Sequence, residues 1–393
     1  KNMAEYQTRN LRMAISTTPE SAYNSIKIDS ADTYLGLLTT GRQFYVPDKE
    51  KADDTGKIGT GREFPTEQRS TYVNVPSLEI SEELNIDIAA LVLRRAMGGS
   101  DVVTTPSGIT GGANTIRDHT WGLYLGDGRQ LPSSSMVWSI GGADYIWGGV
   151  VVESFSISQT NSDNPTMTAA LVGSGIFKRI RMLTDTGLAA LNGTNTYEGP
   201  YPGSSGTEYP PQFPMPATQR YMIGAESELL FTPQGDSPLS ITASGQRMKS
   251  FSATLTNNHR TDDRRPGDPR VDSTNPRAGH YVNRMNHGDR TVAAEMTVML
   301  DDDLNEFYLA YNDTIIESFT YKAKGRFLSV TAGTDSNKQS EFEITFPKCY
   351  FRGVTGTDDS GDAVLTISIF VVDNGSTGPM IARVRTSSSS AIV

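Results

Sequence analysis

The chain has 393 residues, a formal net charge of −10 and one cysteine, Cys349. The net negative charge argues against a nucleic-acid-binding surface, which needs clustered Lys and Arg. A single cysteine excludes a disulfide within the chain and suggests no thiolate metal site. No apolar run approaches membrane-spanning length, so we expect a soluble protein without an export signal or a membrane partner.

The first half combines one predicted helix with closely spaced predicted strands. Ile86, Ala90, Leu93 and Met97 recur at helical spacing and Gly98-Gly99 ends the pattern, which predicts a helix over 86–97. The charged, Gly-containing stretch 47–69 is predicted to be a loop. Alternating and aromatic-rich segments predict strands over 121–125, 135–140, 145–159 and 164–172.

The chain is expected to divide into two domains of similar kind. Residues 195–217 are dense in Gly, Pro, Ser and Tyr, which predicts a stiff linker between a first domain, 1–194, and a second, 218–393. In the second domain an acidic cap, Asp301–Asp303, precedes apolar residues at helical spacing and predicts a helix over 301–311. Strands are predicted over 221–232, 239–243, 318–327, 340–351 and 363–373.

A Ser-Phe-Ser phrase occurs twice, at 154–156 and at 250–252, each time in an alternating strand that is followed by an alternating return strand. Period-two alternation predicts two half-buried hairpins with one apolar and one polar face. The polar faces carry Ser and Thr without charges, which suits a surface that is hydrated but has little affinity for other molecules. The residues predicted to form these faces are Ser154, Ser156, Ser158, Thr166, Thr168, Ser250, Ser252, Thr254, Thr256 and Thr297.

The sequence contains no catalytic constellation. The four histidines lack ligand spacing, and an acidic helix cap explains Asp301–Asp303 without a metal. We therefore expect no enzyme, no cofactor and no metal. The long loop 257–290 interleaves Arg and Asp, and mixed signs suit the charged rim of another protein. The loop residues predicted to contact a neighbouring subunit, or the next layer of an assembly, are Arg260, Asp262, Asp263, Arg264, Arg265, Asp268, Arg270 and Arg284.

The order of elements resembles the tail-tube fold of bacteriophage major tail proteins. In the second half the resemblance rests on the hairpin 248–256 with 291–300, the helix 301–311 and the strands that follow it. In the first half it rests on the helix 86–97, the segment 136–150 and the first Ser-Phe-Ser hairpin. The resemblance spans most of residues 72–380, but the loop of the second hairpin is much longer than that of the first.

The resemblance implies a mainly β fold, a β-sandwich or partial barrel with short helices, in two tandem tail-tube-like domains. Their hairpins would form a β-barrel between subunits, with the Ser and Thr faces lining its lumen. The protein would be a structural virion protein of a long non-contractile phage tail, assembled in the bacterial host cytoplasm into stacked rings. Implied partners are other copies of the chain, a tape measure protein inside the tube, tail terminator and tip proteins at its ends, and double-stranded DNA in transit.

Two tandem hairpins per chain also lead us to expect rings of three chains with pseudo-six-fold geometry, the hairpins following one another head to tail. A ring of six chains is the alternative. A second functional class stays open, a carbohydrate-binding β-sandwich module of a tail fibre or similar adhesin, and a β-rich hydrolase is a third. Sugar binding needs exposed aromatic platforms, whereas the alternation around Trp121, Trp138 and Trp147 predicts core positions.

Overall fold

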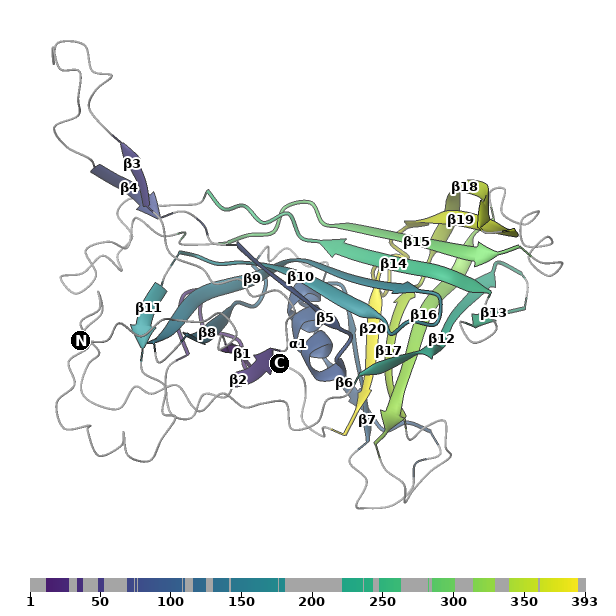
Figure 1. Ribbon diagram of the computed structural model, residues 1–393, viewed down its shortest axis with the longest axis horizontal. Coiled ribbons are helices and arrows are strands. Elements are labelled where there is room, and N and C mark those ends of the chain that lie inside the picture. The colour runs from purple at the N-terminus through teal and green to yellow at the C-terminus, as the bar shows by residue number, and fades with distance from the viewer. Residues whose placement is uncertain are drawn as a thin grey trace, which may run out of the picture.

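The computed structural model describes residues 12–27, 34–37, 49–52, 69–73, 75, 77–107, 109, 116–124, 130–140, 143–175, 177–180, 221–235, 237–242, 247–262, 282, 285–300, 314–328, 339–359 and 361–387. A mainly β fold is confirmed, with 18 strands in one continuous antiparallel sheet that folds into layers (Figure 1). A separate pair consists of β3 (Lys49–Ala52) and β4 (Arg69–Val73). The loop predicted over 47–69 therefore contains a strand.

Seven strands make the first layer, which we call the hydroxyl sheet. Their antiparallel order is β5 (Ser77–Glu83), β10 (Thr166–Val172), β9 (Ala143–Thr160), β14 (Met248–Thr256), β15 (Thr291–Met299), β19 (Asp362–Val371) and β18 (Cys349–Asp359). Both predicted hairpins lie in this layer, one as β9–β10 and the other as β14–β15. The layer thus joins strands from both predicted domains.

A second layer, which we call the charged sheet, faces the first. Its order is β13 (Leu239–Thr242), β12 (Met222–Pro233), β16 (Ile316–Phe327), β17 (Gln339–Phe346), β20 (Ile381–Thr386), β7 (Arg117–Gly122) and β6 (Val102–Thr104). The pair Ile316 and Cys349 joins β16 to β18 and links the two layers at one corner. The single strand predicted over 340–351 is two strands, because Pro347 and Lys348 interrupt it.

Strand β9 bends and serves two layers. Its first part pairs with β8 (Ser134–Ile140) and β11 (Phe177–Ile180), and β8 continues to β1 (Arg12–Ser16) and β2 (Tyr34–Leu37). Gly149 has a φ of 63° at the bend, where an added Cβ would lie 2.1 Å from Asn24 Oδ1. Only glycine suits both the backbone conformation and the space at this position.

The buried carboxylate of Glu20 holds this bend in place. It accepts hydrogen bonds from Ser133 Oγ at 2.7 Å, Ser135 Oγ at 2.8 Å, and the backbone N–H groups of Gly149 and Asn24 at 3.1 and 3.0 Å. Burial raises the pKa of Glu20, although these four donors act in the opposite direction. The N-terminal segment is therefore tied to the point where β9 changes layers.

The predicted helix over 86–97 is confirmed as α1 (Ile86–Met97). The side chain of Asn85 accepts the Asp87 N–H at its start, and Gly98 ends it in the left-handed conformation with a φ of 75°. Ten of its residues are buried, because the helix packs against β9, β20, β17 and β7. It occupies the interior of the molecule rather than its surface (Figure 1).

Aromatic side chains fill the space between the two large sheets. Phe251 of the hydroxyl sheet stacks on Tyr321 of the charged sheet with ring centroids 4.4 Å apart, and Phe319 and Phe346 extend the stack. Phe155 and Phe251, the centres of the two Ser-Phe-Ser phrases, are each 1% exposed. The apolar faces of both hairpins therefore form one side of the main core.

Candidate assembly surface

The two hairpins lie side by side within the chain, joined through their first strands. Strand β9 pairs antiparallel with β14, and Ile157 stands opposite Ala253 at the centre of the register. In the sequence repeat Phe155 corresponds to Phe251, and Ile157 therefore corresponds to Ala253. Because Ile157 and Ala253 also stand opposite each other in the sheet, a local two-fold axis passes between them. The head-to-tail relation expected between the hairpins is wrong, because that relation would require the first strand of one hairpin to meet the second strand of the other.

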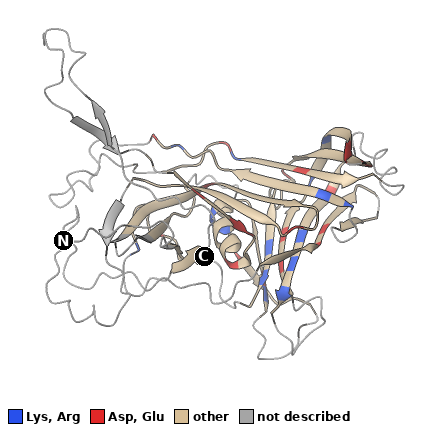
Figure 2. Cartoon of the chain, in the orientation of Figure 1, with Lys and Arg blue, Asp and Glu red and all other residues tan. Residues whose placement is uncertain are grey.

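The solvent face of the four central strands is almost free of charge. Its outward positions lie within 154–160, 166–170, 250–256 and 291–297, all of which the structure describes, and Glu295 is the one charged residue among them. Figure 2 shows this contrast, since β9, β10 and β14 are mostly tan while β16, β17 and β20 carry blue and red. All ten residues predicted for the polar faces lie on this surface and are half-buried or exposed.

The hydroxyl groups of this face bind one another across the strands. Ser158 Oγ and Thr166 Oγ1 are 2.9 Å apart, and Thr297 Oγ1 lies 3.1 Å from Thr366 Oγ1 on β19. Thr168 Oγ1 donates to Ser81 Oγ on β5 at 3.4 Å. Their hydrogen bonds are thus partly satisfied within the sheet, which leaves a flat polar surface with little attraction for ions.

The tip of the first hairpin is anchored to the charged sheet by a buried polar group. Gln159 accepts a hydrogen bond from Tyr321 Oη at 2.7 Å and donates to the Gly224 carbonyl at 2.9 Å. A Cβ on Gly224 would lie 1.8 Å from the Asp163 carbonyl oxygen, so glycine permits the turn to approach β12. The hairpin therefore has a fixed position over the core.

The second hairpin is anchored at its loop end to the C-terminus of α1. Asn257 Nδ2 donates to the carbonyls of Ala96 at 3.1 Å and Val152 at 2.7 Å. Arg290 donates to Asn257 Oδ1 at 2.7 Å, to the Met97 carbonyl at 3.2 Å and also to the Ala96 carbonyl. These bonds satisfy helix carbonyls that lack partners within the helix, and burial lowers the pKa of Arg290 to about 10.

A histidine and a carboxylate meet beside this anchor. His259 Nδ1 lies 2.7 Å from Glu153 Oε2, which also accepts the His259 backbone N–H at 2.9 Å. Burial alone would raise the pKa of Glu153, but the hydrogen bonds and charge of His259 lower it below its usual value. Glu153 occupies the irregularity where the pairing of β9 with β10 shifts register.

The Arg/Asp loop is described only near its ends. Arg260 and Asp262 are exposed, and Arg260 N donates to the Asn286 carbonyl at 2.9 Å. The helix predicted over 301–311 and the linker predicted over 195–217 lie outside the described residues, and so do the remaining loop residues named for a neighbour. These last are Asp263, Arg264, Arg265, Asp268, Arg270 and Arg284.

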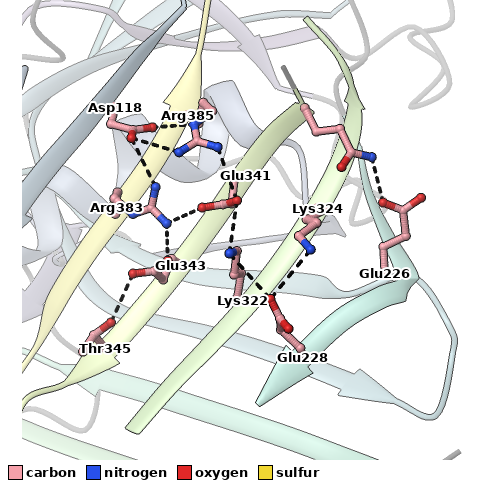
Figure 3. A network of polar contacts seen from close by, with 11 residues as sticks. Asp118, Glu226, Glu228, Lys322, Lys324, Glu341, Glu343, Thr345, Arg383 and Arg385 are labelled. Carbon is pink, nitrogen blue, oxygen red and sulfur yellow. Dashed lines mark hydrogen bonds and ion pairs between the residues drawn. The ribbon is translucent and has the colours of Figure 1, made fainter. Parts of the chain in front are cut away.

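The outer face of the charged sheet carries a network that the sequence analysis missed (Figure 3). Its strands alternate in sign, with Glu228 on β12, two lysines on β16, two glutamates on β17, two arginines on β20 and Asp118 on β7. Arg385 Nε contacts Asp118 at 2.7 Å and its Nη1 contacts Glu341 at 3.5 Å. Lys322 Nζ reaches Glu341 at 3.4 Å and Glu228 at 3.5 Å.

Arg383 completes this network by contacting Glu341, Glu343 and Asp118. Burial by itself would lower the pKa of Arg383, but the carboxylates raise it above its ordinary value. A signal for the network does exist in the sequence, because like charges recur two residues apart on three strands. These pairs are Lys322 with Lys324, Glu341 with Glu343, and Arg383 with Arg385.

Features of the other functional classes are scarce in the described part of the chain. No group of three or more His, Cys, Asp or Glu residues there could hold a metal ion. Trp121 and Trp147 are 1% and 0% exposed, so these two do not form a sugar platform. Among the described helices, none has the length and apolar character needed to cross a membrane.

Comparison with known proteins gives little further information. No family model matches the sequence, and no curated protein matches it. A hybrid solid-state NMR and cryo EM structure of the SPP1 tail tube is similar to 42% of this chain and 78% of that chain, with 12% identity and a TM-score of 0.22. Values this low support no inference about this chain, so its function is argued from its own geometry.

Proposed function

We propose that this chain is a structural virion protein that assembles into stacked rings and forms a phage tail tube, with the hydroxyl sheet lining the channel for DNA. The observation that carries the proposal is the continuous, nearly uncharged hydroxyl face of the two joined hairpins. Lys and Arg are missing from residues 154–160, 166–170, 250–256 and 291–297 of its four central strands, and Lys249 at the start of β14 is paired with Asp362 at 3.0 Å.

The chemistry of this face suits DNA in transit. Proteins hold DNA mainly by neutralising phosphates with Lys and Arg, which releases counterions. A wall of Ser and Thr lacks this source of affinity, and Glu79 and Glu295 add weak repulsion. DNA would therefore pass without being retained.

Anchoring of both hairpins supports a structural role. Gln159 holds the first hairpin on the charged sheet, while Asn257 and Arg290 hold the second on α1. A channel wall must keep its shape while a polymer moves past it, and buried polar anchors fix one arrangement. A tape measure protein inside the tube, terminator and tip proteins at its ends, and a place in the virion tail belong to the same proposal.

Negative-stain microscopy of the purified protein tests the proposal. Stacked rings or tubes are the expected result. Discrete monomers that bind glycans would instead favour the carbohydrate-binding module, for which the exposed aromatic residues Tyr124, Phe327 and Phe370 are the available contacts among the described residues. Monomers with hydrolytic turnover would favour an enzyme.

A substitution can then test which face lines the channel. Ser252→Arg places a positive charge on the half-buried centre of the hydroxyl face. Tubes of this variant should form normally but retain double-stranded DNA at low salt, and the retention should fall as salt rises. Ser376→Arg, in an exposed turn outside the sheets, is the matched control and should not retain DNA. Equal behaviour of the two variants would show that the hydroxyl face does not line the channel.

A further inference from the structure

Two charged residues at opposite edges of the hydroxyl sheet form no ion pair with any residue that the structure describes. Arg352 on β18 is exposed, and its guanidinium lies 3.7 Å from the ring centroid of Phe370, but it forms no ion pair with a described residue. Glu83 on β5 is exposed and likewise forms no ion pair with a described residue. By contrast, Lys249 on the same sheet pairs with Asp362 at 3.0 Å.

Arg352 and Glu83 are the two ends of one row across all seven strands. The residues between them stand opposite one another in the successive registers of the sheet. In order, the row contains Glu83, Thr166, Ser158, Ser252, Glu295, Ser368 and Arg352. Six spacings of about 4.8 Å separate its ends by about 29 Å, so the two charges cannot meet within one chain.

Both edges also have backbone groups available for pairing. Among the described residues, β5 pairs only with β10, and β18 pairs along its length only with β19 apart from the single contact at Cys349. Unpaired edges of this kind are templates for another strand. Six antiparallel pairings separate β5 from β18, so the two strands run in the same direction.

We infer that β18 of one copy joins β5 of the next copy, with Arg352 paired to Glu83 at the seam. This inference rests on the proposed ring assembly and names its contact. The next chain continues the same row, so the hydroxyl surface extends across the seam without a gap. The acidic turn formed by Asp358, Asp359 and Asp362 lies beyond the end of β5 in this register, so it does not oppose Glu83.

Charge reversal tests the seam with the full chain. Arg352→Glu alone and Glu83→Arg alone should each lower the fraction of assembled protein by about tenfold or more, because each brings like charges together across the interface. The double variant Arg352→Glu/Glu83→Arg should assemble again in a ring of any size, since every seam then joins opposite charges. Arg326→Glu, at an exposed site on the charged sheet, is the matched control and should assemble like the unmodified chain.

The outcomes separate this inference from the proposed function. If the unmodified chain forms rings and Arg352→Glu does too, or if the double variant fails to assemble, the seam is wrong while the tube proposal stands. If the unmodified chain stays monomeric under all assembly conditions, both fall. Circular dichroism of each variant checks that loss of assembly is not loss of folding. An equal mixture of the two single variants can close only rings with an even number of chains, so it should assemble if rings contain six chains and fail if they contain three.

Discussion

The two large sheets bury similar apolar faces but present different chemistry to their surroundings. The hydroxyl sheet offers Ser and Thr groups that bind one another, whereas the charged sheet offers strands of alternating sign whose side chains are mostly half-buried. In the ion network of the charged sheet each residue has its counter-ion beside it, so the network is neutral but depends on every partner. On the hydroxyl sheet each group contributes little, so substitution there should be tolerated by the fold.

The largest effect is expected from Arg385→Met on the charged sheet. The Arg385 side chain is 7% exposed and contacts Asp118 and Glu341, which are 11% and 3% exposed. Removing Arg385 leaves Asp118 with Arg383 alone and Glu341 with Arg383 and Lys322, so two buried carboxylates lose part of their compensation and the free energy of unfolding should fall by about 3 kcal/mol. Lys324→Met is the control, because Lys324 is 28% exposed and its loss should cost less than about 1 kcal/mol. Denaturant unfolding measures both, and equal losses would contradict the contrast between the faces.

A smaller effect is expected from Arg290→Met, which removes the anchor beneath the second hairpin. The substitution removes the charged donor to the carbonyls of Ala96 and Met97, which keep only Asn257 Nδ2 and the Tyr124 N–H, so the free energy of unfolding should fall by about 2 kcal/mol. Arg260→Met, at an exposed site in the same loop, should change it by less than about 0.5 kcal/mol. Denaturant unfolding of the two variants tests whether the hydroxyl sheet depends on this anchor.

The Glu153 and His259 pair should give the hydroxyl sheet a pH dependence in acid. The pKa of Glu153 is lower in the folded protein than its ordinary value of 4.5. The stability it contributes is therefore fully present above pH 4.5 and is lost as the pH falls through the folded value. The difference in melting temperature between the unmodified chain and Glu153→Gln should shrink between pH 5 and pH 3. A difference that stays constant over this range would show that ionisation of Glu153 is not responsible.

The smallest effects are expected on the hydroxyl face itself. Ser156→Ala and Thr168→Val remove hydroxyl groups from half-buried positions but retain the apolar face below. Each should change the free energy of unfolding by less than about 0.5 kcal/mol. A loss above about 1 kcal/mol for either variant would mean that the hydroxyl network stabilises the fold, which would remove the contrast with the charged sheet.

Local signals in the sequence predicted the elements that local chemistry determines. The helix over 86–97 follows from its apolar spacing and Gly98, and both hairpins follow from their alternation around Phe155 and Phe251. The Ser and Thr positions of the polar faces followed from the same alternation. Their place on a channel wall, the number of chains in a ring and the division into domains stay predictions.

Pairings between distant segments could not be predicted in the same way. The contact of β9 with β14 depends on the packing of both hairpins over one core, and nothing within either segment specifies its neighbour. Strand β20 was missed although Ala382 and Val384 alternate with Arg383 and Arg385, because the carboxylates that neutralise these arginines come from β17 and β7. The anchoring roles of Asn257 and Arg290 were missed because their acceptors are carbonyls of α1.

The junction of the two hairpins also has a consequence for how the chain folds. Each hairpin pairs strands that follow one another in the chain, but Thr160 must find Ser250, 90 positions later. The entropy lost on closing such a loop makes the pairing of β9 with β14 slow to form compared with contacts close in sequence. We expect the first hairpin to form early and the pairing of β9 with β14 to form in the rate-limiting step. Because closure entropy grows slowly with loop length, insertions between the two hairpins should slow folding only slightly.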